Sequence, residues 1–171
     1  MNLDFHKVYD LQNIYECSLI ENPVVIRKVI AAKDRWKTYE LVYDVNVQLS
    51  NEKVLTIPAD FRWDLSSVPR VFWSILPPDG DFIIAALIHD WLYVEKEKTL
   101  NWFDGNNWKA RKFADKEMLK WSLVMHKGGY LDWRTYDNYI RYVGVRLFGW
   151  FVWRADSSKI KLMNAFLLKS E

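Results

Sequence analysis

Residues 83–93, with the sequence IIAALIHDWLY, decide how the rest of the chain is interpreted. Every residue before His89 in this stretch is apolar, which predicts a buried helix. Placing His89 and Asp90 in such a helix costs roughly several kcal/mol unless polar partners compensate for the lost water. The pair therefore indicates catalysis, metal binding or a buried structural network, and the stretch alone leaves these alternatives open.

Asp115 is the expected partner of His89. It lies on a second predicted helix, over residues 108–126, beside the apolar stripe of that helix and one turn after Arg111. If the two helices pack together, the Asp115 carboxylate would bond to one imidazole nitrogen and leave the other nitrogen free as a base. The structural alternative is a His–Asp pair that ties a loop to the core.

Asp90 and Tyr93 differ in their angle round the first helix. Asp90 projects about 100° beyond His89, so we expect it to bind a cation or to accept backbone hydrogen bonds. Tyr93 follows His89 by four residues and lies on the same face of the helix. Tyr93 is therefore a candidate member of the same site.

A second polar cluster consists of Asp64, Ser66 and Ser67, between Trp63 and Pro69. Asp and Ser side chains in an irregular segment commonly bond to nearby backbone groups and so build turns. The functional alternative is that these side chains complete a site with His89.

The composition predicts one globular domain over residues 1–171, with no boundary inside it. Ten Trp, nine Tyr and nine Phe form an unusually large aromatic content, which favours protein interfaces and allows a homo-oligomer. The net charge of +2 gives no case for nucleic-acid binding. The single cysteine, Cys17, excludes an intrachain disulfide and a Cys-rich zinc site.

No membrane or export segment is expected. The first residues lack the apolar run of a signal peptide. The apolar stretch over residues 143–153 is interrupted by Arg146 and is too short to span a bilayer.

The first third of the chain is typical of β-structure. Residues 39–49 alternate between apolar and polar, with Val42 as the exception, and this predicts one half-buried antiparallel strand. Residues 50–52 form a turn, residues 53–57 a return strand, and another strand begins near residues 23–26.

Three helices follow. The first is expected to be capped within residues 79–81, and a loop over residues 95–107 separates it from the second helix. The third helix starts after the cap candidate Asp132 and runs to about residue 153. Its apolar side chains repeat at helical spacing: Trp133, Tyr136, Ile140, Val143, Leu147 and Phe151. The predicted fold class is α+β, with a small N-terminal antiparallel sheet followed by three helices that carry the His–Asp site.

Four ordered motifs resemble a family of phage and prophage proteins known as domain of unknown function 1353. Residues 57–70, IPADFRWDLSSVPR, resemble its signature VPxGFxTDLASVPR. Residues 85–93 are similar to AAVLHDYLY, residues 111–115 to SRxxAD, and residues 142–149 to YxAVRLFG. The resemblance spans roughly residues 24–153 and implies a bacteriophage or prophage origin, but no established activity.

The chain departs from the family pattern in three places. Asp60 replaces a glycine, Ser66 replaces an alanine, and the insert between Tyr93 and Arg111 is long. The Asp60 change affects the local turn.

The His–Asp helix is also similar, more loosely, to the helix pair of phospholipase A2 enzymes. That similarity implies His89 as the general base, Asp90 as a ligand of Ca²⁺ or another divalent metal, and Asp115 as the carboxylate that orients His89. The glycine-rich calcium loop of those enzymes is missing, so residues 64–67 would have to supply its carbonyl groups. A Ser67–His89–Asp115 triad is a third alternative.

The sequence thus predicts a bacteriophage-encoded accessory protein that is virion-associated, for example in the tail, or takes part in assembly. Its expected partners are other phage proteins or virion components, and its expected location is the virion or the host cytoplasm during assembly. The alternative is a hydrolase of ester or amide bonds in the host envelope that uses His89, Asp90 and Asp115.

Overall fold

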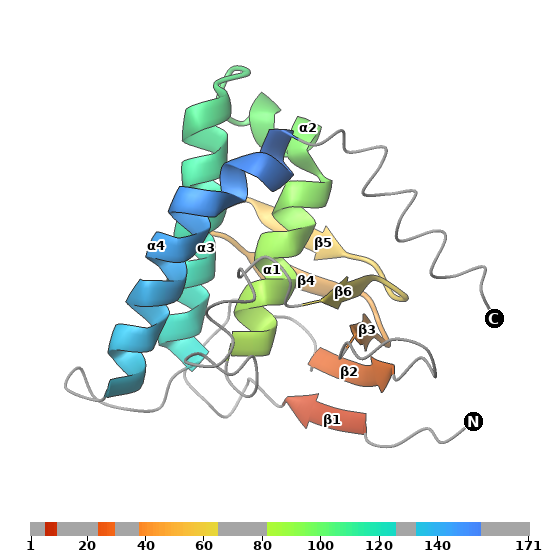
Figure 1. Cartoon of the computed structure of the whole chain (residues 1–171). Helices are drawn as coiled ribbons and strands as arrows, with labels where there is room; N and C mark the ends of the chain where they lie inside the picture. The colour runs from red at the N-terminus through yellow and green to blue at the C-terminus, as the bar shows by residue number, and fades with distance from the viewer. Residues whose placement is uncertain (1–5, 10–23, 30–37, 65–81, 126–132, 155–171) are drawn as a thin grey trace. The chain divides into compact units, whose positions relative to one another are not determined.

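A computed structural model describes residues 6–9, 24–29, 38–64, 82–125 and 133–154 (Figure 1). The predicted helix cap within residues 79–81 lies outside this described part of the chain.

The chain divides into two compact units, residues 1–64 and residues 65–171. The first unit holds the strands and the second holds the helices, so the predicted α+β class, with strands before helices, is confirmed. The expectation of a single domain stays a prediction.

The first unit contains two antiparallel sheets. The larger sheet has the order β1-β2-β3-β6, and the smaller one pairs β4 with β5. The strands are β1 (His6–Tyr9), β2 (Val24–Val29), β3 (Thr38–Leu41), β4 (Val45–Gln48), β5 (Val54–Ile57) and β6 (Arg62–Asp64). Strand β2 confirms the strand expected near residues 23–26, and the β4–β5 hairpin confirms the predicted turn and return strand.

The prediction of one continuous strand over residues 39–49 is wrong. The chain bends at residues 42–44, and β3 and β4 belong to different sheets. Hydrogen bonds stabilise the bend, because the backbone N–H of Asp60 donates to the Leu41 carbonyl at 2.8 Å and the N–H of Ala59 donates to Asp44 Oδ1 at 2.7 Å. Tyr43 is consequently exposed instead of lying on the buried face.

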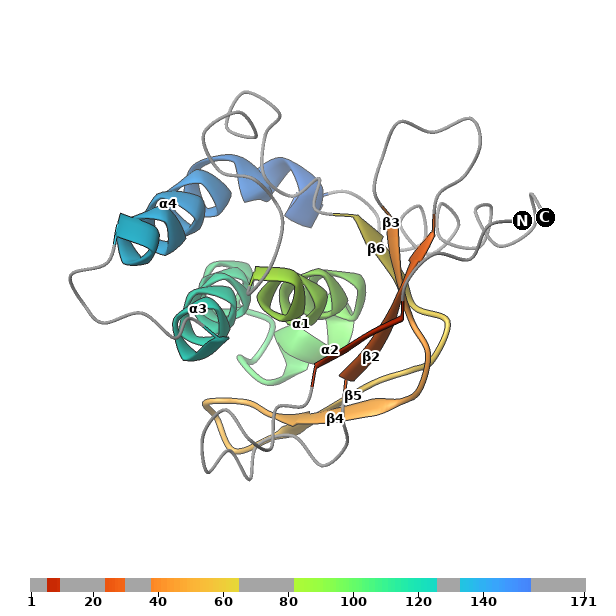
Figure 2. The same ribbon diagram turned by 90° about the horizontal axis from the view of Figure 1, so that it is seen from below.

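The second unit contains four helices: α1 (Phe82–Val94), α2 (Lys96–Asn101), α3 (Asn107–Met125) and α4 (Trp133–Arg154). Helix α3 packs against both α1 and α4, as Figures 1 and 2 show. Helix α1 is buried round almost its whole circumference, as its continuous apolar run predicts. The two long helices begin and end within about one residue of the predicted positions.

The loop expected over residues 95–107 is partly helical, because α2 lies within it. Contacts with distant residues stabilise this short helix. Thr99 Oγ1 donates to the Leu92 carbonyl at 3.1 Å, and Lys96 Nζ donates to the Trp153 carbonyl at 2.7 Å. The local lysine-rich composition, from which the loop was predicted, carries no sign of either contact.

Helix α4 packs through the face opposite its predicted apolar stripe. The stripe residues Tyr136, Ile140, Val143, Leu147 and Phe151 are exposed. The buried side chains are Thr135, Asn138, Arg141, Val145 and Trp153, most of which are polar. Among the described helices, none is long and apolar enough to cross a membrane.

Candidate functional site

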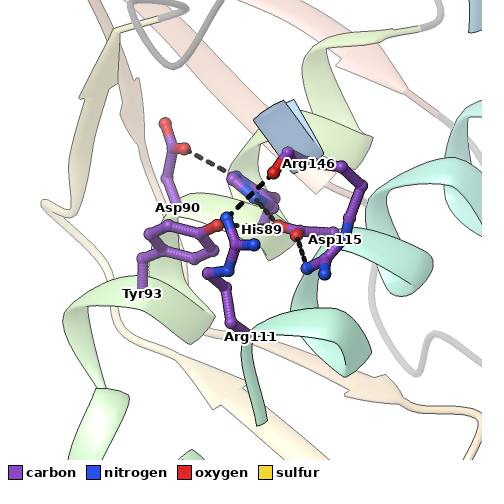
Figure 3. Close-up of polar contacts among 6 residues, drawn as sticks. All are labelled: His89, Asp90, Tyr93, Arg111, Asp115 and Arg146. Carbon is purple, nitrogen blue, oxygen red and sulfur yellow. Dashed lines mark hydrogen bonds and ion pairs between the residues drawn. The ribbon is translucent and has the colours of Figure 1, made fainter. Parts of the chain in front are cut away.

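His89 lies between the carboxylates of Asp90 and Asp115 (Figure 3). Its Nε2 is 3.1 Å from Asp115 Oδ1 on α3, and its Nδ1 is 3.2 Å from Asp90 Oδ1 on its own helix. The imidazole is almost completely buried, whereas the Asp90 side chain is 15% exposed. The predicted contact between His89 and Asp115 is therefore confirmed.

Asp115 is fully buried and accepts hydrogen bonds from two helices. Besides the contact with His89, Oδ1 accepts a hydrogen bond from the Tyr93 hydroxyl at 2.7 Å. Oδ2 accepts one from Arg146 Nη1 on α4 at 2.6 Å. One carboxylate on α3 thus joins α1 and α4, and each of its oxygens has a donor.

Arg146 is itself positioned by residues of α3. Arg111 Nη1 donates to the Arg146 carbonyl at 3.2 Å, and the Arg146 guanidinium lies 6.0 Å from the centre of the Trp108 ring. Arg111 therefore positions the α4 backbone.

The aromatic ring of Tyr93 is held on two sides. The imidazole of His89 lies 4.3 Å from its centre, and Trp153 meets it edge-on at 4.9 Å. Trp153 is fixed in turn, since its Nε1 donates to Asn107 Oδ1 at 3.1 Å. Packing and hydrogen bonds together leave Tyr93 little freedom to move.

The protonation of His89 follows from these contacts. Burial lowers the pKa of an imidazole, but the hydrogen bonds and negative charges of Asp115 and Asp90 outweigh burial here and raise the His89 pKa from 6.5 to about 9. At neutral pH both ring nitrogens therefore carry protons, and each donates to a carboxylate. The expectation that one nitrogen stays free as a base is wrong, because Asp90 reaches it.

Next to the protonated His89, Asp115 is ionised and Tyr93 keeps its proton. Burial alone would raise the pKa of Asp115, but the hydrogen bond and charge of His89, with the bonds from Tyr93 and Arg146, lower it below its usual value. Burial and the charge of Asp115 raise the pKa of Tyr93, so its hydroxyl keeps its proton and donates. The site is a network of two carboxylates, Asp115 at its centre and Asp90 at its outer end, whose charges balance those of one imidazolium and one guanidinium.

Five of the residues singled out from the sequence, namely His89, Asp90, Tyr93, Arg111 and Asp115, meet in this region (Figure 3). Asp64 ends β6 in the other unit, and Ser66 and Ser67 lie outside the described residues.

Sequence reasoning missed two members of the site, Arg146 and Gly149. The signal for Arg146 was available, since it is the one charge that interrupts the apolar stretch over residues 143–153.

The described residues contain only part of the expected calcium site, because residues 65–67 lie outside them. Among residues 6–9, 24–29, 38–64, 82–125 and 133–154, no group of three His, Cys, Asp or Glu side chains could hold a metal ion. Both oxygens of Asp115 accept hydrogen bonds, and the Arg146 cation lies beside them. Calcium binding at Asp90 therefore stays a prediction.

Gly149 allows α4 to approach Tyr93. A Cβ at this position would lie 2.8 Å from the Tyr93 hydroxyl oxygen and 3.3 Å from Val145 Cγ1. Because Tyr93 is bonded to Asp115 and packed against Trp153, it cannot yield without breaking the network. The close helix contact therefore requires glycine.

We expect Gly149→Ala to lower the free energy of unfolding by about 1–3 kcal/mol through overpacking. Gly144→Ala is the matched control on the same helix, because a Cβ there meets nothing within 4 Å. The control should stabilise the protein by up to about 1 kcal/mol, since alanine has the higher helix propensity. Urea denaturation of both variants measures the difference, and equal midpoints would show that α4 does not approach Tyr93 this closely.

Comparison with known proteins gives one match. A family model described as "Protein of unknown function (DUF1353)" matches residues 39–140, which is more than half of the chain and includes α1 and α3. No curated protein and no solved structure matches the chain.

Proposed function

The chain belongs to the family of unknown function DUF1353, and from its geometry we propose that it is a phage- or prophage-encoded accessory protein that binds other proteins. In this proposal the His89–Asp115 network stabilises the helical unit and catalyses nothing. The protein would act in the virion or during assembly in the host cytoplasm, with other phage proteins as partners. The motifs that resemble phage and prophage proteins support this origin.

The observation that carries the proposal is that both nitrogens of His89 lie within hydrogen-bond distance of a carboxylate oxygen. A general base must accept a proton from substrate or water, and an imidazolium has no lone pair with which to do so. The raised pKa of His89 keeps the imidazole in this state at neutral pH. The network resembles a buried ion pair that joins elements of a fold more closely than it resembles a catalytic pair.

One observation favours the alternative, a hydrolase of host-envelope esters or amides. The Asp90 carboxylate is partly exposed, whereas His89 is not, so the row of Asp90, His89 and Asp115 reaches solvent at one end. If Asp90 moved away, Nδ1 of His89 would lose its carboxylate partner, and Asp115 would still orient the ring.

The test is a hydrolysis assay with purified protein on phospholipid vesicles, ester substrates and peptidoglycan, each with and without calcium. We expect no turnover above the background set by His89→Gln. Lys116→Ala, which changes an exposed residue next to Asp115, is the matched control. Calcium-stimulated hydrolysis that the wild type and Lys116→Ala share and folded His89→Gln lacks would favour the hydrolase.

Mass spectrometry of particles of the encoding phage should detect the chain if it is a virion component.

A further inference from the structure

Helix α4 exposes an apolar stripe that nothing in the His89 network requires. We define the α4 stripe as Tyr136, Ile140, Val143, Leu147 and Trp150. Their exposed fractions range from 38% at Trp150 to 61% at Tyr136 and Leu147. Isolated exposed apolar residues are ordinary, but a contiguous row of them marks an interaction surface.

The spacing of the α4 stripe is that of a helix–helix seam. Successive members are separated by four, three, four and three residues, which is the repeat of the core positions of a coiled coil. Exposed Tyr139 and Phe151 flank the stripe, and with them it covers about 120° of the helix at about 100° per residue. A surface of this shape fits a second helix laid along α4.

The opposite face of α4 is already used, so the helix cannot turn its stripe inward. Asn138 Nδ2 donates to the Ser122 carbonyl at 3.3 Å, and the Arg141 guanidinium lies 4.5 Å from the centre of the Phe82 ring. Arg146 donates to buried Asp115. Turning α4 would expose these polar contacts and break the network.

We propose that α4 of one molecule pairs antiparallel with α4 of a second copy through the α4 stripe. The inference rests on the proposed function, since it names one protein partner of an accessory protein. The seam is about 21 Å long, so the area that it buries lies at the small end of the range for stable interfaces. We therefore expect the dimer to dissociate in the micromolar range.

Charge complementarity favours a second copy in this orientation. Among the α4 residues whose burial the structure describes, Arg154 is the one exposed charge, and Asp137 is half-exposed near the other end. Antiparallel pairing places Ile140 against Trp150 and Val143 against Leu147. The same register brings Arg154 of each copy beside Tyr136 and Asp137 of the other.

The first test is the oligomeric state of the full chain by analytical ultracentrifugation across the micromolar range. Val143→Asp should raise the dimer dissociation constant by about tenfold or more, because it places a charge at the centre of the seam. Val54→Asp is the matched control, since Val54 is equally exposed but lies on β5. Circular dichroism checks that both variants are folded.

The second test concerns orientation. Arg154→Glu and Asp137→Arg should each weaken the dimer, and the double variant should recover its strength, because the exchanged charges meet again only in antiparallel pairing. Recovery in the double variant supports the seam, and additive weakening overturns the antiparallel register.

Two results would overturn the pairing itself: a wild-type monomer throughout the concentration range, or a dimer that Val143→Asp leaves intact. A monomer that floats with phosphatidylcholine–phosphatidylglycerol vesicles, and loses this with Val143→Asp, would assign the stripe to a lipid surface instead. These outcomes are separate from the failure of the proposed function, because hydrolysis that requires His89 would contradict the accessory role whether or not the dimer forms.

Discussion

Asp115→Ala is expected to lower the free energy of unfolding by about 3–5 kcal/mol, the range measured when one partner of a buried ion pair is removed. The substitution leaves three donors without their acceptor: the buried His89 imidazolium, the buried Tyr93 hydroxyl and the partly buried Arg146 guanidinium. Two of these donors are cations, so their mutual repulsion adds to the loss of hydrogen bonds.

Chemical denaturation of matched variants measures this effect. Lys116→Ala changes the neighbouring, exposed residue of α3 and should shift the free energy of unfolding by less than about 0.5 kcal/mol. Asp115→Asn keeps an acceptor oxygen but removes the charge, so its free energy of unfolding should lie between those of Asp115→Ala and Lys116→Ala. If Asp115→Ala and Lys116→Ala unfold at the same midpoint, Asp115 is not the centre of a buried network.

Stability is expected to fall by about 3 kcal/mol between pH 6.5 and pH 9 because of His89 alone, in proportion to the rise of its pKa from 6.5 to about 9. A group whose pKa is higher in the folded protein binds its proton more tightly there. Its contribution is complete below the unfolded pKa and is lost as the pH rises through the folded value. The lowered pKa of Asp115 acts in the opposite direction, and its contribution is lost in acid.

Urea denaturation at a series of pH values tests this expectation. His89→Gln should be less stable than the wild type near pH 6, and the gap should narrow towards pH 9.5 as the wild type loses the imidazolium. A gap that stays constant across this range would mean that His89 is neutral in the folded protein.

Much of the helical unit could be predicted from the sequence because its signals are local. The apolar run before His89 fixes a buried helix, and the helical spacing near Asp115 fixes a second one. A buried imidazole and a buried carboxylate each need a partner, so two such groups on packed helices were expected to meet. The contact between His89 and Asp115 follows from that requirement.

The remaining features depend on contacts between distant residues. Strand β3 ends early because hydrogen bonds from residues 59 and 60 compete with continued pairing. Helix α4 is oriented by Arg146 and Asn138, whose polar contacts outweigh the burial of its apolar stripe. The periodicity of the sequence identifies the two faces of such a helix but does not tell which face packs against the core.

Long-range ¹H–¹⁵N correlation NMR of the imidazole measures the protonation of His89 directly. At pH 7 both Nδ1 and Nε2 should show the shifts of protonated nitrogens, and titration should give a pKa of about 9. His6, on β1 in the other unit, is the internal comparison in the same spectra. A neutral His89 tautomer at pH 7, with a pKa at or below 6.5, would contradict the account and restore a free nitrogen for catalysis.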